Sequence, residues 1–136
     1  MPFIRITAGK PMAAQQKQLL GQRTTLLMAS VLGKRQEVTS VLVEEVIGPL
    51  GDGWFIGGQG IDLQRNAPVH CDIYITAGSN TEVDKARMIA AMRGLLHEAL
   101  DDPPTASHII IHEVPATDWG YDGQTQAARR LTAQKL

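Results

Sequence analysis

Cysteine is nearly absent from this sequence: Cys71 is the one thiol among 136 residues, so no disulfide can form within the chain. A single cysteine is typical of proteins that fold in a reducing compartment, and we expect a cytoplasmic location. No apolar run reaches the roughly 20 residues that a membrane-spanning helix needs. The amino-terminal residues also lack the basic and then apolar pattern of a signal peptide. We therefore expect no membrane partner.

An excess of charge of either sign is also missing. Lysine and arginine number 13 against 14 aspartates and glutamates, which gives a net charge of -1 with histidine neutral. Nucleic-acid-binding domains usually carry a basic face, so we expect no nucleic-acid partner. Aromatic residues make up only 4% of the chain, which makes the two tryptophans, Trp54 and Trp119, informative positions.

An internal repeat organises what is present. The segment Ile4–Lys10 reads IRITAGK, and Ile73–Ser79 reads IYITAGS, so the two segments are identical at five of seven positions. In each half an extended segment comes first, followed by a helical stretch of about twenty residues and a second, β-branched extended segment. A glycine-rich tail with one tryptophan then follows. The sequence therefore predicts two copies of one structural unit.

The helices of the two units have recognisable ends. We expect the first helix to begin near Pro11, because proline is favoured at the first helical position, and to stop at Gly33. Thr81 is the expected N-cap of the second helix, which Pro103 prevents from continuing. The second extended segments are about residues 39–46 and 106–114. The apolar stripes with helical spacing comprise Leu19, Leu20, Leu27, Val31 and Leu32 in the first helix, and Ile89, Met92, Leu96 and Leu100 in the second.

Each half is thus a β-α-β unit, whose two strands should run parallel with a right-handed crossover. One unit alone is too small to be stable. We expect an α+β fold in which two fused units (β-α-β-β-α-β) give a four-stranded mixed sheet, two helices on one face and a pseudo-twofold internal repeat. Residues 1–136 would form a single domain of two repeats, about 1–62 and 69–136. The other face of the sheet would stay bare, which predicts a homo-oligomer.

Pro2 is the candidate catalytic residue. If Met1 is removed, Pro2 carries a free secondary amine, and α-amines titrate at about 7.7–8.0. Burial and nearby cations lower that pKa, so a neutral prolyl nitrogen can act as a base near pH 7. The alternative is a proline that merely begins a strand, where its missing N–H has no cost.

Several motifs together resemble those of a known family. Pro2 directly after Met1, a short strand ending in Gly9-Lys10, and the later run GWFIGG over residues 53–58 look like 4-oxalocrotonate tautomerase. The second half, with EVP over residues 113–115 and DWGYDG over residues 118–123, is similar to the carboxy-terminal half of malonate semialdehyde decarboxylase. The chain thus resembles a fused, two-unit member of the tautomerase superfamily.

The resemblance implies a tautomerase or isomerase that moves a proton in a small enol or α-keto carboxylic acid, with the amino-terminal proline as general base. It implies no cofactor, a small carboxylate-bearing substrate as partner, and a homo-oligomer in the form of a trimer. One alternative is a hydratase, dehalogenase or decarboxylase of the same superfamily. Another is an oligomeric binding relative without catalytic activity.

The family's site residues carry over only in part. Lys10 stands where the family has a substrate-binding arginine, and lysine lacks the bidentate fork. Ser79, the neutral counterpart of Lys10, fills that place in the second half, and His108 takes the place of a second-strand arginine. Cys71 replaces the second proline, so one site per chain is expected. The remaining substrate-binding candidates are Trp54 and Trp119, which match the tail aromatic, and Tyr121 as a hydrogen-bond donor.

The partner of the substrate carboxylate stays open among Lys10, His108, Arg5 and Arg35. Arg5 alternates with Ile4 and Ile6 and so should face away from their side of the sheet. His108 and His112 share one face of a strand, but no second ligand cluster with suitable spacing appears, so we expect no metal site.

Overall fold

The computed structural model describes residues 2–46, 53–61 and 67–135. Met1 and residues 62–66, which make up most of the junction between the two expected repeats, therefore lie outside the described residues. The elements in chain order are β1 (Phe3–Ala8), α1 (Ala14–Leu32), η1 (Gln36–Val38), β2 (Ser40–Glu45), β3 (Phe55–Ile56), β4 (Gln59–Gly60), β5 (Val69–Thr76), α2 (Glu82–Ala99), β6 (Ile109–Val114), β7 (Gly120–Tyr121), β8 (Gln124–Thr125) and α3 (Gln126–Lys135).

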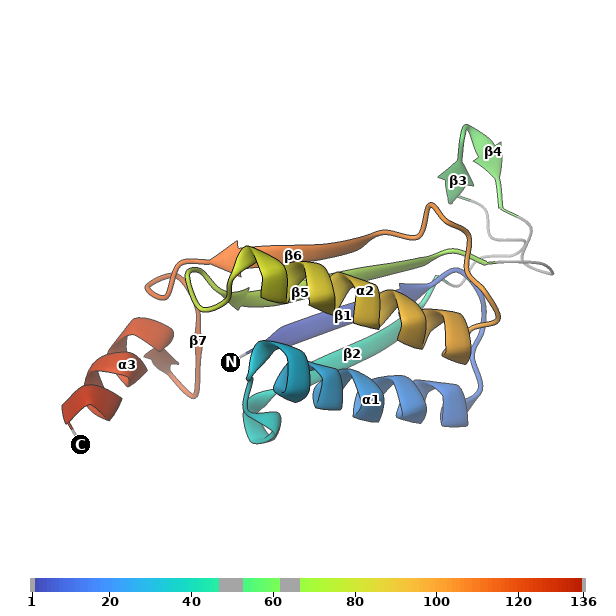
Figure 1. Ribbon diagram of the computed structural model, residues 1–136. Coiled ribbons are helices and arrows are strands. Elements are labelled where there is room, and N and C mark those ends of the chain that lie inside the picture. The colour runs from blue at the N-terminus through green and yellow to red at the C-terminus, as the bar shows by residue number, and fades with distance from the viewer. Residues whose placement is uncertain (1, 47–52, 62–66, 136) are drawn as a thin grey trace.

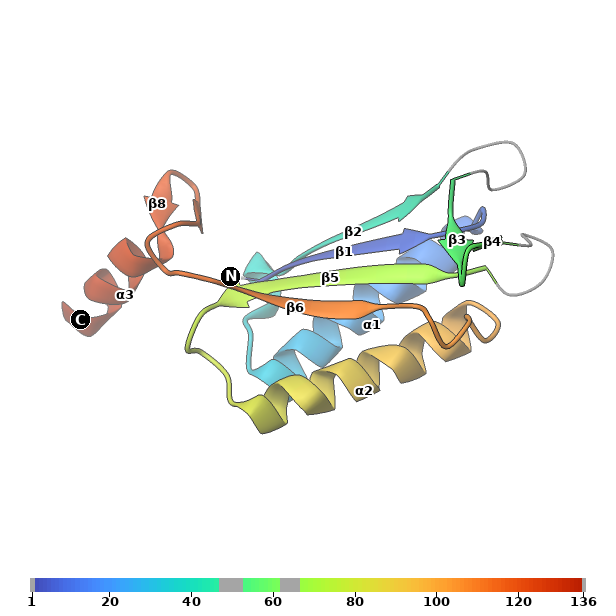
Figure 2. The same cartoon turned by 90° about the horizontal axis from the view of Figure 1, so that it is seen from above.

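Four strands form the main sheet in the order β2-β1-β5-β6. Within each repeat the strands are parallel, because β1 pairs with β2 and β5 with β6, whereas the central pair β1 and β5 is antiparallel. Helices α1 and α2 lie side by side on one face of this sheet (Figures 1 and 2). The predicted α+β fold of two β-α-β units is confirmed. None of the described helices is both long and apolar enough to cross a membrane.

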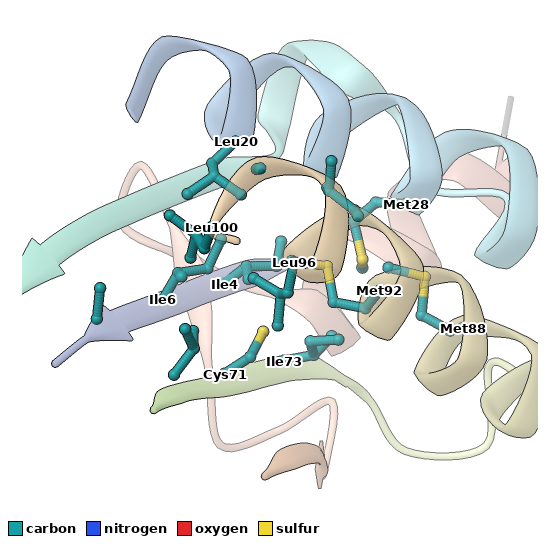
Figure 3. Close-up of a cluster of buried hydrophobic side chains, with 14 of the residues drawn as sticks. Ile4, Ile6, Leu20, Met28, Cys71, Ile73, Met88, Met92, Leu96 and Leu100 are labelled. Atoms are coloured by element: carbon teal, nitrogen blue, oxygen red, sulfur yellow. The ribbon is translucent and has the colours of Figure 1, made fainter. Parts of the chain in front are cut away.

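The hydrophobic core lies between the sheet and the two helices (Figure 3). Alternate residues of the central strands point into it, including Ile4 and Ile6 from β1 and Cys71 and Ile73 from β5. These four side chains are fully buried. Each large aliphatic side chain that is removed from water contributes roughly 1.5–3 kcal/mol to folding. The helices supply the opposite wall with Leu20, Met28, Met88, Met92 and Leu96.

The first helix begins later than the sequence predicts. It starts at Ala14 and not near Pro11, because the preceding backbone has other partners. The Met12 N–H donates to Glu45 Oε1 at 2.9 Å, which ties this segment to the end of β2, and the Ala13 N–H donates to Gln16 Oε1 at 2.8 Å. The predicted stop is confirmed, since Gly33 adopts a left-handed conformation with φ of 69°.

The buried faces of the helices are rotated slightly from the predicted stripes. Leu19 and Ile89, which both belong to the predicted apolar stripes, are each 39% exposed. Thr24 and Met28 take the core positions in α1, and Met88 takes one in α2. The predicted N-cap of α2 is confirmed, because Thr81 Oγ1 accepts a hydrogen bond from the Asp84 N–H at 3.1 Å.

Of the two strands predicted after the helices, the first has nearly the predicted bounds and the second begins later than predicted. The segment predicted at 39–46 forms β2 over Ser40–Glu45. The segment predicted at 106–114 is shorter, since β6 spans Ile109–Val114 and residues before it form a turn closed by Ser107 N–H to Pro104 O at 3.0 Å.

The open face of the sheet is more polar than predicted. Leu42 and Ile110 are exposed on it, as expected for a bare face. Its centre, however, holds pairs of polar and charged side chains. Arg5 Nε lies 2.6 Å from Glu44 Oε1, and Asp72 accepts from His112 Nε2 at 2.6 Å. Arg5 thus faces away from the side of Ile4 and Ile6, as predicted.

The two short hairpins lie at opposite ends of the sheet (Figures 1 and 2). The β3–β4 hairpin of the first repeat lies near the end of β1, whereas β7, β8 and α3 of the second repeat lie near its beginning. Each repeat therefore places its tail beside the starting strand of the other repeat.

Candidate functional site

Pro2 lies immediately before β1 and is buried, with under 2% of its side chain exposed. Its carbonyl accepts a hydrogen bond from the Ser40 N–H at 3.2 Å, which extends the parallel pairing of β1 and β2 by one step. The parallel register therefore fixes Pro2 beside the start of β2. The neighbours of its nitrogen must come from elements that reach this end of the sheet.

Trp119 and Tyr121 belong to the carboxy-terminal tail, which reaches this end. Because β1 and β5 are antiparallel, with Phe3 opposite Tyr74, β5 ends at Thr76 beside the place where β1 begins. Trp119 Nε1 donates to Thr76 Oγ1 at 3.2 Å. Tyr121, which follows on β7, stacks under the guanidinium of Arg129 at 3.7 Å from the ring centroid.

A cavity of about 500 Å³ opens at the same end of the sheet. Its walls come from the segment after α1, where Lys34 and Arg35 lie, and from the tail, where Tyr121, Arg129 and Arg130 lie. We call this space the cationic cavity, because four lysines and arginines line it and none of the described lining residues is acidic. Val38, two residues before the Ser40 that bonds to Pro2, also lines it, so the cavity and Pro2 share one end of the sheet, although Pro2 is not among the lining residues.

Lys34 joins the two repeats in the wall of this cavity. Its Nζ donates to Ser79 Oγ at 2.8 Å. Burial lowers the pKa of Lys34, and the nearby charge of Arg130 lowers it further, against an opposing effect of Asp84. Ser79 holds the place in the second repeat that Lys10 holds in the first. A cation from the first repeat thus stands where the second repeat lacks one.

The structure divides the predicted site residues between the two ends of the sheet. Trp119 and Tyr121 share the end with Pro2, whereas Lys10 follows the far end of β1. Trp54 and His108 are also at the far end: Trp54 directly precedes β3, and the His108 carbonyl accepts from the Cys71 N–H at 2.9 Å near the start of β5. A strand of six residues spans roughly 20 Å, so one chain does not bring both groups together.

Arg5 and Arg35 have carboxylate partners within the chain. Arg5 pairs with Glu44 on the open face, and Thr7 Oγ1 donates a hydrogen bond to the same carboxylate. Both hydrogen bonds lower the pKa of Glu44. Arg35 Nη2 lies 3.5 Å from Glu37 Oε1, with both side chains about two-thirds exposed. Of the four cations around the cavity, Arg35 is the one with an ion pair among the described residues, whereas Asp84 acts on Lys34 without forming an ion pair with it.

The described residues support neither a metal site nor a reactive thiol. Within residues 2–46, 53–61 and 67–135, no group of three His, Cys, Asp or Glu side chains is placed to hold a metal ion. Cys71 is fully buried in the core, and burial raises the pKa of its thiol to about 12. Its thiol is therefore uncharged near neutral pH.

Sequence reasoning missed Lys34, Arg129, Arg130 and the whole of α3. One signal was available for Lys34, because a parallel β-α-β unit must return its helix–strand loop to the end where the first strand begins. For α3 the signal was weaker: two adjacent arginines in a polar run with no apolar stripe to indicate how it would pack.

The tautomerase family, described as tautomerase enzyme, matches this chain over residues 2–63 and again over residues 70–129. The first match begins at Pro2. The chain is also 42% identical over 67 residues to probable tautomerase K2 of Dickeya dadantii (strain 3937). The matched segment covers 48% of this chain and 94% of that protein.

Two solved structures share the fold across nearly the whole chain. The F6 fused 4-OT wild type asymmetric trimer has a TM-score of 0.80 and 24% identity, covering 93% of this chain and 98% of that one. The Q0 fused 4-OT wild type symmetric trimer has a TM-score of 0.78 and 16% identity, with the same two coverages. Both matches extend over two fused units, in agreement with the internal repeat.

Proposed function

The chain belongs to the tautomerase family, and we propose that it moves a proton in a small enol or α-keto carboxylic acid with Pro2 as general base. The observation that carries this proposal is the position of Pro2. It is the first residue of the family match, it is buried, and it lies at the end of the sheet where the cationic cavity opens. Burial and positive charge at the same end of the sheet both favour the neutral form of a free prolyl amine, which is the form that accepts a proton.

Trp119 and Tyr121 support the proposal as neighbours of this end of the sheet. We propose that Trp119, held by its bond to Thr76, limits access of water to Pro2. Lys10, Trp54 and His108 lie at the far end of the same chain, so we propose that they serve a site only across a contact between protomers. The two solved relatives are trimers by their descriptions, and we propose the same assembly here.

We also propose that residues 1–136 act as one domain of two repeats, about 1–62 and 69–136. The core draws on both repeats, because Leu20 of α1 and Leu96 of α2 pack in one cluster. The chain has one cysteine, Cys71, and so no disulfide within it, which agrees with the cytoplasmic location that we propose.

A second activity within the superfamily is the alternative: a hydratase, dehalogenase or decarboxylase, in line with the resemblance of the second half to malonate semialdehyde decarboxylase. Those reactions require a protonated proline as acid. Release of carbon dioxide or halide, with no ketonisation of enol acids, would favour this alternative.

The test is ketonisation of phenylenolpyruvate and 2-hydroxymuconate by the wild-type protein and by Pro2→Ala. General base catalysis contributes on the order of 10²–10⁴ in rate, and we expect kcat to fall by at least about 100-fold. Pro11→Ala is the matched control, because Pro11 is an exposed proline after the far end of β1. Mass spectrometry of the amino terminus must show loss of Met1. Wild-type turnover no higher than that of Pro2→Ala would refute the proposal.

A further inference from the structure

We propose that the cationic cavity binds a small dianion through Lys34, Arg129 and Arg130, with the chemistry of either a dicarboxylate or a phosphate monoester. This inference rests on the proposed function in one respect: the dianion is part of the substrate whose proton Pro2 moves. The binding itself is argued from the cavity.

The first argument is charge. Four cationic side chains line a cavity of about 500 Å³, and no acidic side chain is among its described lining residues. Arg35 has Glu37 as a partner, but Arg129 and Arg130 form no ion pair within the part of the chain that the structure describes. Like charges that face a shared space repel one another. A bound anion removes that repulsion, and two negative charges match the three remaining cations better than one.

The second argument is unused hydrogen-bonding capacity. Gln126 Nε2 and Arg129 Nε, both on residues that line the cavity, are buried and have no hydrogen-bond partner among the described residues. Buried donors in native proteins are nearly always paired with protein or with a bound species. These two donors belong to one turn of α3 and lie within the cavity wall, so they mark unused hydrogen-bonding capacity there and are not counted among the groups that contact the ligand.

The third argument is that the cations are held in place. The Arg129 guanidinium stacks on Tyr121 at 3.7 Å, and its Nη2 donates to the Tyr121 carbonyl at 3.0 Å. Lys34 is held by Ser79 at 2.8 Å. Side chains whose geometry is fixed before binding lose less conformational freedom when a ligand arrives. The cavity therefore has the features of a built anion site and not of a loose surface patch.

The test is direct binding, measured by calorimetry near neutral pH and low salt, with succinate and phenyl phosphate as dianions and acetate as a monoanion. We expect the wild-type protein to bind at least one dianion more tightly than acetate. Lys34→Gln and Arg130→Gln should each weaken that binding by roughly tenfold to a hundredfold, as expected for one charge-assisted hydrogen bond. Preference for succinate or for phenyl phosphate then identifies the dicarboxylate or the phosphate class.

Arg23→Gln is the matched control, since Arg23 is a half-exposed arginine of α1 that pairs with Glu98 and does not line the cavity. Arg130 is exposed, so Arg130→Gln should fold, and circular dichroism checks this. Equal binding by Arg130→Gln and wild type, equal weakening by Arg23→Gln, or no preference for dianions would each overturn the inference. Pro2→Ala should bind the dianion normally, so loss of the proposed catalysis and loss of the anion site are distinguishable.

Discussion

Lys34 Nζ donates a hydrogen bond to Ser79 Oγ at 2.8 Å, across the boundary between the two repeats. Ser79 is the counterpart of Lys10 in the internal repeat, and it is neutral. A cation is thus restored at this place from the loop after α1, by a residue that has no matching role in the repeat pattern. The positive charge that position 79 lacks is supplied by Lys34, which is distant from Ser79 in the sequence but in contact with it in the fold.

This contact gives a pH dependence for anion binding. Burial and the neighbouring Arg130 lower the pKa of Lys34, so Lys34 loses its proton at a pH below the ordinary lysine range. Binding of a dianion needs the charged form, and affinity should therefore fall as pH rises, starting below the pH range in which an ordinary lysine titrates. Calorimetric titrations from neutral to alkaline pH measure this. Lys34→Arg, which keeps its charge, should flatten the profile; an unchanged profile would contradict the assignment.

The titration of Lys34 should also change the stability of the fold, which should rise with pH where the affinity for the anion falls. The unfolded chain keeps the Lys34 proton to a higher pH than the folded chain does, so it binds more protons between the two pKa values. Stability against urea should accordingly rise with pH across that window in the wild type relative to Lys34→Met. A difference between the two proteins that does not change with pH would show that Lys34 is not desolvated.

Cys71 should be chemically silent in the folded protein. Its side chain is fully buried and burial raises its pKa to about 12, so neither access nor thiolate is available at pH 8. We expect no reaction with a thiol reagent such as dithionitrobenzoate until the protein is unfolded, when one thiol should react. Rapid labelling of the native protein would contradict the burial of β5.

The helix N-caps offer a pair of substitutions with opposite effects. Thr81→Ala removes the bond from the Asp84 N–H and should destabilise the protein by about 1 kcal/mol. The equivalent position before α1 is Ala13, which has no side-chain cap, so Ala13→Ser should stabilise by roughly 0.5–1 kcal/mol. Urea denaturation of both variants measures these changes. The same sign for both would contradict the capping argument.

Two isoleucines test the placement of the core. Ile73→Ala leaves a cavity in a fully buried site and should cost about 2–5 kcal/mol. Ile89→Ala, at a residue that is 39% exposed, should cost distinctly less. Urea denaturation measures the free energy of unfolding of both variants. Equal losses would mean that Ile89 lies in the core, in contradiction to its exposure here.

Much of the fold follows from local rules that the sequence states directly. Alternation at Ile4 and Ile6, the capping pair at Thr81, and the stop at Gly33 are each decided by neighbouring residues. The start of α1 was not predictable in this way, because the Met12 N–H is taken by Glu45, more than thirty residues away.

The candidate site was harder to predict for the same reason. Pro2, Trp119 and Tyr121, which were predicted as site residues, lie at one end of the sheet. Lys10 and His108, which the family resemblance placed in the same site, lie at the far end. Lys34 and Arg130 meet because a loop and a carboxy-terminal helix converge in space. No spacing in the sequence encodes that convergence.

The exchange of tails between the repeats also has a consequence for synthesis. The four sheet strands and both core helices are complete once Val114 has been made, whereas Trp119, Arg129 and Arg130 follow it. A premature stop after Val114 would therefore leave the core residues in place and remove Trp119 together with the tail side of the cationic cavity. The part of the chain that is made after the core thus supplies residues to the end of the sheet where Pro2 lies.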